Sequence, residues 1–305
     1  MKACGDKEEF AVIEKRTWSS LLFDGLNALV LLALTLLFLY PMWYVLMGSF
    51  SDPFSLFVSN ELLLLPKGFS LKGYEQVFQN PNILTGYKNT LFYVTVGTCA
   101  NVLATSLGAY VLSRNGLLLK KCFTIMVVFT MYFSGGLIPT FLVVKNIGLF
   151  DSRLALILPT LVGTWNMIVM RTSFRALPAS MEESARIDGA NDLVILFRIV
   201  LPCAKATVAV IVLYYAVGYW NSWFNAMIYL QDKSKYPLQL FLREILLANT
   251  ANGATSSGFE ESDMLYLEDV VRYATVIVST VPILCVYPFC QKYFMKGVMM
   301  GSVKE

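Results

Sequence analysis

Six long runs without a charged residue constrain this chain more than any other feature of its sequence. They cover residues 25–51, 89–113, 122–144, 154–170, 206–231 and 273–291. A helix needs about 17–25 apolar residues to cross the hydrocarbon core of a bilayer, so each run has spanning length. Charged residues make up 15% of the chain, whereas soluble domains carry roughly a quarter. The sequence therefore predicts an all-α integral membrane protein with six transmembrane helices.

Absent residue types exclude several kinds of chemistry. The chain has no histidine, which excludes a Ser-His-Asp or Cys-His catalytic pair and any histidine-bound metal. Its six cysteines show no CxxC spacing and are interpreted as reduced, structural residues. No Gly-Lys dipeptide occurs, so the chain has no Walker A loop to bind ATP. A net charge of +3, interrupted by the apolar runs, gives no indication of nucleic-acid binding.

The distribution of lysine and arginine predicts the orientation. Six spans place both termini on one side of the membrane, and 15 of the 24 basic residues lie on that side, in residues 1–24, 114–121, 171–205 and 292–305. Lysine and arginine concentrate on the cytoplasmic side of membrane proteins. We therefore expect a cytoplasmic N-terminal segment (1–24), a six-span domain (25–305) with a cytoplasmic C-terminus, and a long external loop (232–272). Residues 253–258 (GATSSG) form the predicted flexible middle of that loop.

The predicted cytoplasmic loop 173–202 is the most informative segment. Ser180 and Glu183 have the spacing of a capping box that begins a helix. Gly189 suits a left-handed cap at the end of that helix, and Asn191 can begin a second one. An amphipathic helix pair on this face could dock into a groove of a partner, or it could be a well-capped surface loop. The local chemistry leaves both possibilities open.

This loop resembles the EAA loop of bacterial ABC importer permeases. The family pattern is Glu-Ala-Ala, three residues, Gly, nine residues, Ile, one residue and Leu-Pro. The chain carries Glu183-Ser184-Ala185, Gly189, Ile199 and Leu201-Pro202 in register. Ser184 is a small-for-small departure, and Asp188-Gly189-Ala190 adds the common Asp-Gly-Ala extension.

Two further segments resemble carbohydrate-importer permeases. Residues 218–225 (GYWNSWFN), followed by Tyr-Pro-Leu at 236–238, are similar to the fifth span and its exit, and residues 291–304 are similar to the C-terminus. The similarity covers about residues 20–305. It is greatest to the maltose-type second permease, in the lipoprotein-partnered branch for complex oligosaccharides.

The resemblance implies the type I ABC importer fold and a non-enzymatic permease subunit. Such a subunit moves a sugar or oligosaccharide into a bacterial cell by ATP-driven alternating access. The implied partners are a second permease, which completes a heterodimer in the cell membrane, and a cytoplasmic ATPase dimer, which binds ATP and magnesium. An extracytoplasmic solute-binding protein, of the lipoprotein type, is the third. The chain itself is expected to bind no cofactor.

The resemblance also assigns roles within the loop. Glu183 would accept an ion pair from the ATPase, Ala185 would pack in its cleft, and Gly189 would allow the sharp turn between two coupling helices. The remaining implied coupling residues are Asp188, Ala190, Leu201 and Pro202.

Polar and aromatic residues within the spans form a candidate solute path. These are Asn101, Tyr214, Gly218, Trp220, Asn221, Trp223 and Asn225. Four of the fifth-span residues recur at helical steps of four, three and four, whereas the tryptophans lie on another face. Aromatic rings stack on sugars, and asparagines satisfy hydroxyl groups. Equally, small and polar residues serve as helix–helix contacts, and tryptophans as interface anchors.

Three other functions are alternatives to a sugar-importer permease. An ABC permease for a non-sugar polar solute, such as a peptide, polyamine or phosphonate, would share the EAA loop. A secondary transporter usually needs acidic residues within the membrane, and the six runs contain none. An intramembrane enzyme would need catalytic carboxylates, and the one acidic cluster, at 260–269, resembles a solvated loop or a docking surface.

Overall fold

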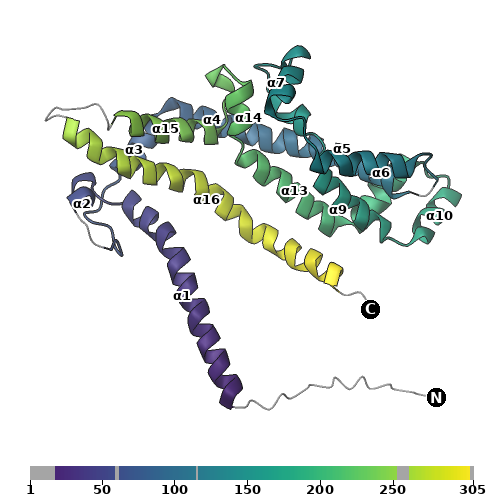
Figure 1. The fold of residues 1–305 in the computed structure, drawn as a ribbon, viewed down its shortest axis with the longest axis horizontal. Coiled ribbons are helices and arrows are strands. Elements are labelled where there is room, and N and C mark those ends of the chain that lie inside the picture. Colours follow the sequence, from purple (N-terminus) through teal and green to yellow (C-terminus); the bar gives the residue numbers. More distant parts are fainter. Residues whose placement is uncertain (1–17, 59–61, 115, 253–260, 303–305) are drawn as a thin grey trace.

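The computed structural model describes residues 18–302, with gaps at 59–61, 115 and 253–260. Every regular element within these residues is a helix (Figure 1). The first half contains α1 (Trp18–Ser49), α2 (Pro53–Val58), α3 (Lys72–Gln79), α4 (Pro81–Phe92), the π-helix η1 (Tyr93–Gly97), α5 (Thr98–Ser113), α6 (Lys120–Tyr132) and α7 (Leu137–Asn146). The second half contains α8 (Leu154–Ile157), η2 (Leu158–Thr160), α9 (Thr164–Arg175), α10 (Ala179–Ile187), α11 (Asp192–Ile195), the π-helix η3 (Leu196–Val200), α12 (Leu201–Cys203), α13 (Lys205–Trp220), α14 (Phe224–Tyr229), η4 (Lys233–Lys235), α15 (Leu238–Asn252) and α16 (Glu261–Ser302).

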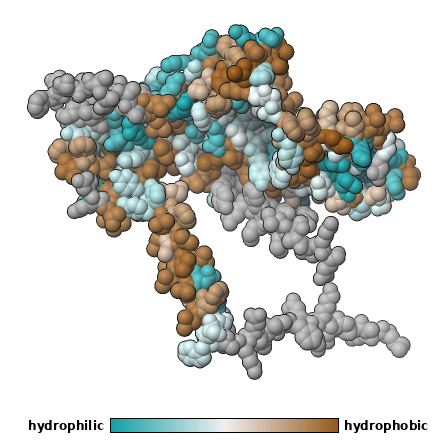
Figure 2. Space-filling model, viewed as in Figure 1, coloured by the Kyte–Doolittle hydropathy of each residue, from teal (hydrophilic) through white to brown (hydrophobic). Residues whose placement is uncertain are grey.

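Among the described residues, two helices are long and apolar enough to cross a membrane. The first is α1, which leaves the helical body at an angle and presents apolar side chains along its length (Figures 1 and 2). It begins at Trp18, within the segment predicted to precede the first span, and residues 1–17 lie outside the described part. The second is the continuous helix Pro81–Ser113, formed by α4, η1 and α5. These helices agree with the first two predicted spans.

Three further candidate spans are broken rather than straight. The α6 and α7 helices meet at 116°, α8–η2 and α9 at 51°, and α11–α12 and α13 at 90°. Gly136, with a φ of +85°, lies at the first break, where the sequence contains two consecutive glycines. The breaks after Tyr132 and Thr160 fall inside the runs 122–144 and 154–170, whereas the 90° bend falls before the run 206–231. Absence of charge therefore does not specify helix continuity. Counting each bent pair as one span gives up to five spans among the described residues.

Besides a small cluster of Leu56, Leu63 and Val270 that packs α2 against α16, three buried clusters hold the described helices together. One joins α5, α9 and α13 to the predicted coupling loop and includes Phe174 and Ile195. A second joins η1, α8, α13 and α14 around Tyr93 and Tyr219. The third packs α3, α4, α15 and α16 together. The α5 and α13 helices thus lie at the centre, between the coupling loop and the breaks in the spans.

The predicted external loop 232–272 is largely helical. It contains η4, α15 and the first turns of α16, and its predicted flexible middle at 253–258 lies outside the described residues. Leu238 and Leu242 of α15 are buried in the cluster that includes α4. The acidic composition of this segment concealed an apolar face that packs on the body of the protein.

Candidate functional site

A cavity of about 360 Å³ opens between α5, α13 and the break that follows η2. The residues that line it are Asn101, Leu156, Thr160, Val162, Gly163, Tyr214, Tyr215, Gly218, Tyr219, Ser222 and Asn225. None of these lining residues is charged, and most of the polar ones carry a hydroxyl or an amide. The cavity therefore offers neutral hydrogen-bonding groups and tyrosine rings.

Side chains from two neighbouring helices satisfy the backbone groups that the break exposes. Asn101 Nδ2 of α5 donates to the carbonyl of Thr160 at 3.0 Å. Tyr215 Oη of α13 accepts from the amide of Gly163 at 2.8 Å and shares a 2.7 Å hydrogen bond with Thr105 Oγ1. Irregular backbone at membrane depth is tolerated where it is buried in protein or lines a cavity. The polar side chains of this region thus stabilise the break by satisfying its backbone groups.

The cavity brings together four of the seven predicted path residues. Asn101, Tyr214, Gly218 and Asn225 line it. Asn101 also accepts a 3.1 Å hydrogen bond from Tyr219 Oη, which links α5 to α13.

The other three predicted path residues lie elsewhere. Trp220 Nε1 donates to the carbonyl of Ser279 in α16 at 3.2 Å. Asn221 Nδ2 donates to the carbonyl of Val217, one turn earlier in its own helix. The exposed ring of Trp223 lies under the guanidinium of Arg243, at 4.3 Å. The prediction that one helix face runs over residues 214–225 was wrong from Asn221 onward, because α13 ends at Trp220 and the chain turns before α14.

Sequence reasoning missed Tyr215, Tyr219, Thr160 and Gly163 of the cavity. Tyr215 and Tyr219 have the one-turn spacing that places residues on one helix face, and this signal was available. Thr160 and Gly163 follow Pro159 in the fourth run, where a proline and a glycine close together favour a break.

The coupling loop has the two caps that the sequence predicts. Gly189 has a φ of +83°, and the amide of Ala190 donates back to the carbonyl of Ala185 at 2.9 Å, which ends α10 in a left-handed cap. The Asn191 side chain accepts from the amide of Val194 at 2.8 Å and begins α11. The predicted capping box is absent, because α10 starts at Ala179 and places Ser180 inside the helix, with no side-chain cap bond.

The predicted coupling residues on and after α10 differ in solvent exposure. Glu183, Asp188 and Gly189 are exposed, whereas Ala185 is 8% exposed and packs in the cluster with Phe174. Ala185 therefore packs against its own chain, and its packing in a cleft of the ATPase stays a prediction.

The last three predicted coupling residues lie where the loop returns to the body. Ala190 and Leu201 are half-buried and pack against the same cluster as Ala185. Pro202 is exposed, two residues before the 90° bend into α13.

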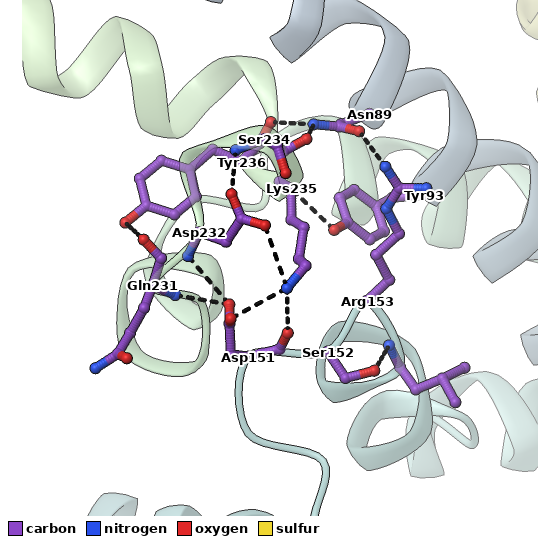
Figure 3. A network of polar contacts seen from close by, with 11 residues as sticks. Asn89, Tyr93, Asp151, Ser152, Arg153, Gln231, Asp232, Ser234, Lys235 and Tyr236 are labelled. Atoms are coloured by element: carbon purple, nitrogen blue, oxygen red, sulfur yellow. Dashed lines mark hydrogen bonds and ion pairs between the residues drawn. The ribbon is translucent and has the colours of Figure 1, made fainter.

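A polar network ties the segment after α14 to the turn before α8 (Figure 3). Asp151 accepts backbone hydrogen bonds from Gln231 at 3.0 Å and Asp232 at 3.1 Å, and its carboxylate lies 3.1 Å from Lys235 Nζ. The two amide donors, and then the lysine, lower the pKa of Asp151 below its usual value. The hydrogen bond to Asp151 raises the pKa of Lys235. Both groups therefore stay charged over a wide pH range.

The start of the second span completes this network. Asn89 Nδ2 donates to the carbonyls of Ser234 at 2.7 Å and Tyr236 at 3.0 Å, and its Oδ1 accepts from Arg153 at 3.0 Å. Tyr93 Oη donates to the carbonyl of Lys235 at 2.8 Å. Three segments far apart in the sequence are thus held together beside the cavity-lining helices.

Comparison with known proteins identifies relatives over almost the whole chain. The polygalacturonan/rhamnogalacturonan transport system permease protein YtcP of Bacillus subtilis is 42% identical over 290 residues, 93% of this chain and 98% of the relative. Protein LplC of the same organism is 37% identical, over 92% of this chain and 95% of its own length. No protein-family model matches the chain.

The fold of the chain is also similar to that of a solved structure. A chain of a bacterial ABC transporter involved in the import of the acidic polysaccharide alginate is 33% identical. It superimposes with a TM-score of 0.84, over 92% of this chain and 99% of that one. With an EAA-type loop, broken spans and these relatives, the chain belongs to the carbohydrate-type permease subunits of ABC importers.

Proposed function

We propose that this permease subunit lines part of the path of an oligosaccharide, and that the solute passes through the cavity between α5, α13 and the break after η2. The observation that carries this proposal is the uncharged lining of tyrosines, asparagines, glycines and hydroxyls around a broken span. Broken spans at membrane depth are where transporters bind their solutes. Tyrosine rings and amide groups match the apolar faces and hydroxyls of a sugar.

The relatives indicate which oligosaccharides to test first. YtcP is named for the transport of polygalacturonan and rhamnogalacturonan, and the solved structure is of an alginate importer. Together they point to fragments of acidic polysaccharides as the solutes of this chain. Because no lysine or arginine is among the described residues that line the cavity, we expect the cavity to contact hydroxyls and ring faces. Selection by charge would then take place outside it. The relatives named for sugars also favour a carbohydrate over a peptide, polyamine or phosphonate.

Gly218 provides a sharp test of the path. It lines the cavity, and a Cβ atom placed on it meets nothing within 4 Å. Gly218→Ala should therefore be accommodated without strain and is the matched control, whereas Gly218→Trp adds a ring large enough to obstruct the cavity. In cells with the complete importer, we expect Gly218→Trp to reduce uptake of labelled oligogalacturonides at least tenfold, at unchanged protein level. Equal uptake by both variants would show that the solute takes another route.

The proposal includes partners. The second permease would complete a heterodimer, an ATPase dimer with ATP and magnesium would lie on the side of the coupling loop, and a solute-binding lipoprotein would lie opposite. Basic residues concentrate on the coupling-loop side, which supports cytoplasmic termini. Mass spectrometry of proteins that co-purify with the tagged chain in mild detergent tests this assembly. Recovery of the chain alone, when other ABC complexes survive, would contradict it.

The exposed face of α10 supports contact with the ATPase. Glu183, Asp188 and Gly189 are all exposed, so a partner can reach each of them. We expect Glu183→Ala to insert and assemble normally but to lose uptake while ATP hydrolysis continues. The matched control is Glu75→Ala, at an exposed glutamate on α3. Normal uptake by Glu183→Ala would contradict the assigned role.

A further inference from the structure

Two adjacent glutamates of α10 face opposite directions. Glu183 is exposed, whereas Glu182 is 7% exposed and forms an ion pair with Arg114. Arg114 directly follows the last residue of α5 and caps that helix. A buried carboxylate is costly unless a cation compensates it. The pair therefore fixes α10 to the end of α5.

The surroundings of Arg114 join both halves of the coupling loop to this helix end. Its guanidinium lies 4.4 Å from the ring centre of Tyr110, one turn earlier in α5. Tyr110 Oη donates to Asp192 of α11 at 3.2 Å, and Asp192 pairs with Arg186 of α10 at 2.5 Å. Within the described residues, Nε and Nη2 of Arg114 have no hydrogen-bond partner. Glu182 is the carboxylate that pairs with this guanidinium in that part of the chain.

The same helix reaches the cavity at its other end. The α5 helix runs without interruption from Thr98 to Ser113, so Asn101 and Arg114 are separated by roughly 20 Å at 1.5 Å per residue. Asn101 bonds Tyr219, and Thr105 bonds Tyr215, both on α13. One rigid element therefore contacts the coupling loop through Arg114 and the cavity through Asn101 and Thr105.

We propose that Glu182 and Arg114 are positioning residues that transmit movement of the coupling loop to α5, and through α5 to the cavity. This inference rests on the proposed function, since it requires a partner that moves the loop. The two glutamates differ in role because they differ in burial. The exposed Glu183 contacts the partner, and the buried Glu182 transmits the movement of α10 to α5 through Arg114. Without the ion pair, α10 still packs through Ala185 but loses its charged link to α5.

The test reads the cavity directly and needs no known solute. Ser222→Cys places a thiol in the cavity lining, and a water-soluble maleimide is applied with or without ATP and vanadate. Labelling at position 222 is measured by peptide mass spectrometry, which separates it from the native cysteines. The complete complex in lipid vesicles is used, with ATP hydrolysis and complex yield measured in parallel. Glu182→Gln and Arg114→Gln are compared with Glu75→Gln, the same chemical change at an exposed glutamate of α3.

We expect nucleotide to change labelling at least threefold in the parent and in Glu75→Gln. In Glu182→Gln and Arg114→Gln this change should disappear while ATP hydrolysis stays within about twofold of the parent. Combining Arg114→Glu with Glu182→Arg should restore it, because the reversed pair rebuilds the link. This restoration is an outcome that a mere loss of folding would not produce.

Two results would overturn the inference and leave the proposed function standing. One is a normal labelling change in Glu182→Gln. The other is a proportional fall of hydrolysis, yield and labelling change that charge reversal does not rescue. Failure of the parent chain to assemble with any ATPase would instead refute the proposed function itself.

Discussion

Adding one methyl group at Gly97 should test the packing that holds the cavity. Gly97 ends the π-helix η1, and a Cβ atom there would lie 2.5 Å from Cζ and 2.6 Å from Cε2 of the Tyr219 ring. Carbon atoms prefer separations of about 3.5–4.0 Å, so in Gly97→Ala the ring must move by roughly an ångström. Tyr219 is 6% exposed and its hydroxyl donates to Asn101 at 3.1 Å. The ring therefore cannot move without breaking that hydrogen bond.

The magnitude follows from three contributions. Overpacking costs about 1–3 kcal/mol, loss of the hydrogen bond costs about 0.5–1.5 kcal/mol, and alanine gains up to about 1 kcal/mol over glycine as a helix former. The net destabilisation should be about 0.5–3.5 kcal/mol. At a few degrees per kcal/mol for a chain of this size, the melting temperature of the purified complex in mild detergent should fall by several degrees.

Two variants make this prediction refutable. A Cβ atom at Gly25, on α1, meets nothing within 4 Å, so Gly25→Ala should leave the melting temperature unchanged or slightly higher. Tyr219→Leu replaces the ring by a smaller side chain, so adding Gly97→Ala to it should cost much less than Gly97→Ala alone. Equal melting temperatures for Gly97→Ala and Gly25→Ala, or strict additivity in the double variant, would refute the packing argument.

Three further variants test the break, the turn and the polar network. Tyr215→Phe leaves the Gly163 amide without its acceptor and should cost about 1–3 kcal/mol, measured by thermal melting; Tyr214→Phe, at a tyrosine 47% exposed, should cost less. At Gly189, with a φ of +83°, Gly189→Val should abolish uptake, whereas Gly189→Asn should retain it, because asparagine tolerates the left-handed region and a β-branched residue does not. Asp151→Asn should increase amide exchange over 231–236 at neutral pH, where the carboxylate of the parent is charged. In the parent, the pKa of Asp151 is lowered, so its carboxylate stabilises the fold above the usual aspartate pKa and loses this effect in acid. The pKa of Lys235 is raised, so its ammonium group loses its effect only in strong alkali. Protection of the 231–236 amides in the parent should therefore stay constant between about pH 5 and pH 9.

Local features of the chain could be predicted from sequence because local rules determine them. The cap at Gly189 needs a residue without a Cβ, and the cap at Asn191 needs a short side chain that accepts a hydrogen bond. Both form as predicted. The capping box at Ser180 failed because the N-cap is Pro178, so the helix starts two residues earlier, at Ala179.

Features that depend on tertiary contacts could not be predicted in this way. The end of α13 at Trp220 interrupts a run without a charged residue, and absence of charge does not specify where a helix ends. The spacing over 214–225 therefore grouped Asn221 with Asn225, although the chain turns between them. Burial of Glu182 is likewise invisible in the sequence, because its partner Arg114 lies 68 positions earlier along the chain.

The position of the cavity follows from the same constraint that forbids charge in the spans. A polar solute needs hydrogen-bonding groups at membrane depth, yet charged side chains there are expensive. A break in a helix exposes backbone amides and carbonyls, and neighbouring side chains must satisfy them in the absence of water. Asn101 and Tyr215 do so at Thr160 and Gly163, and both residues line the cavity. A neutral polar path through an apolar chain therefore arises where a span is interrupted, and α5 connects that point to the coupling loop.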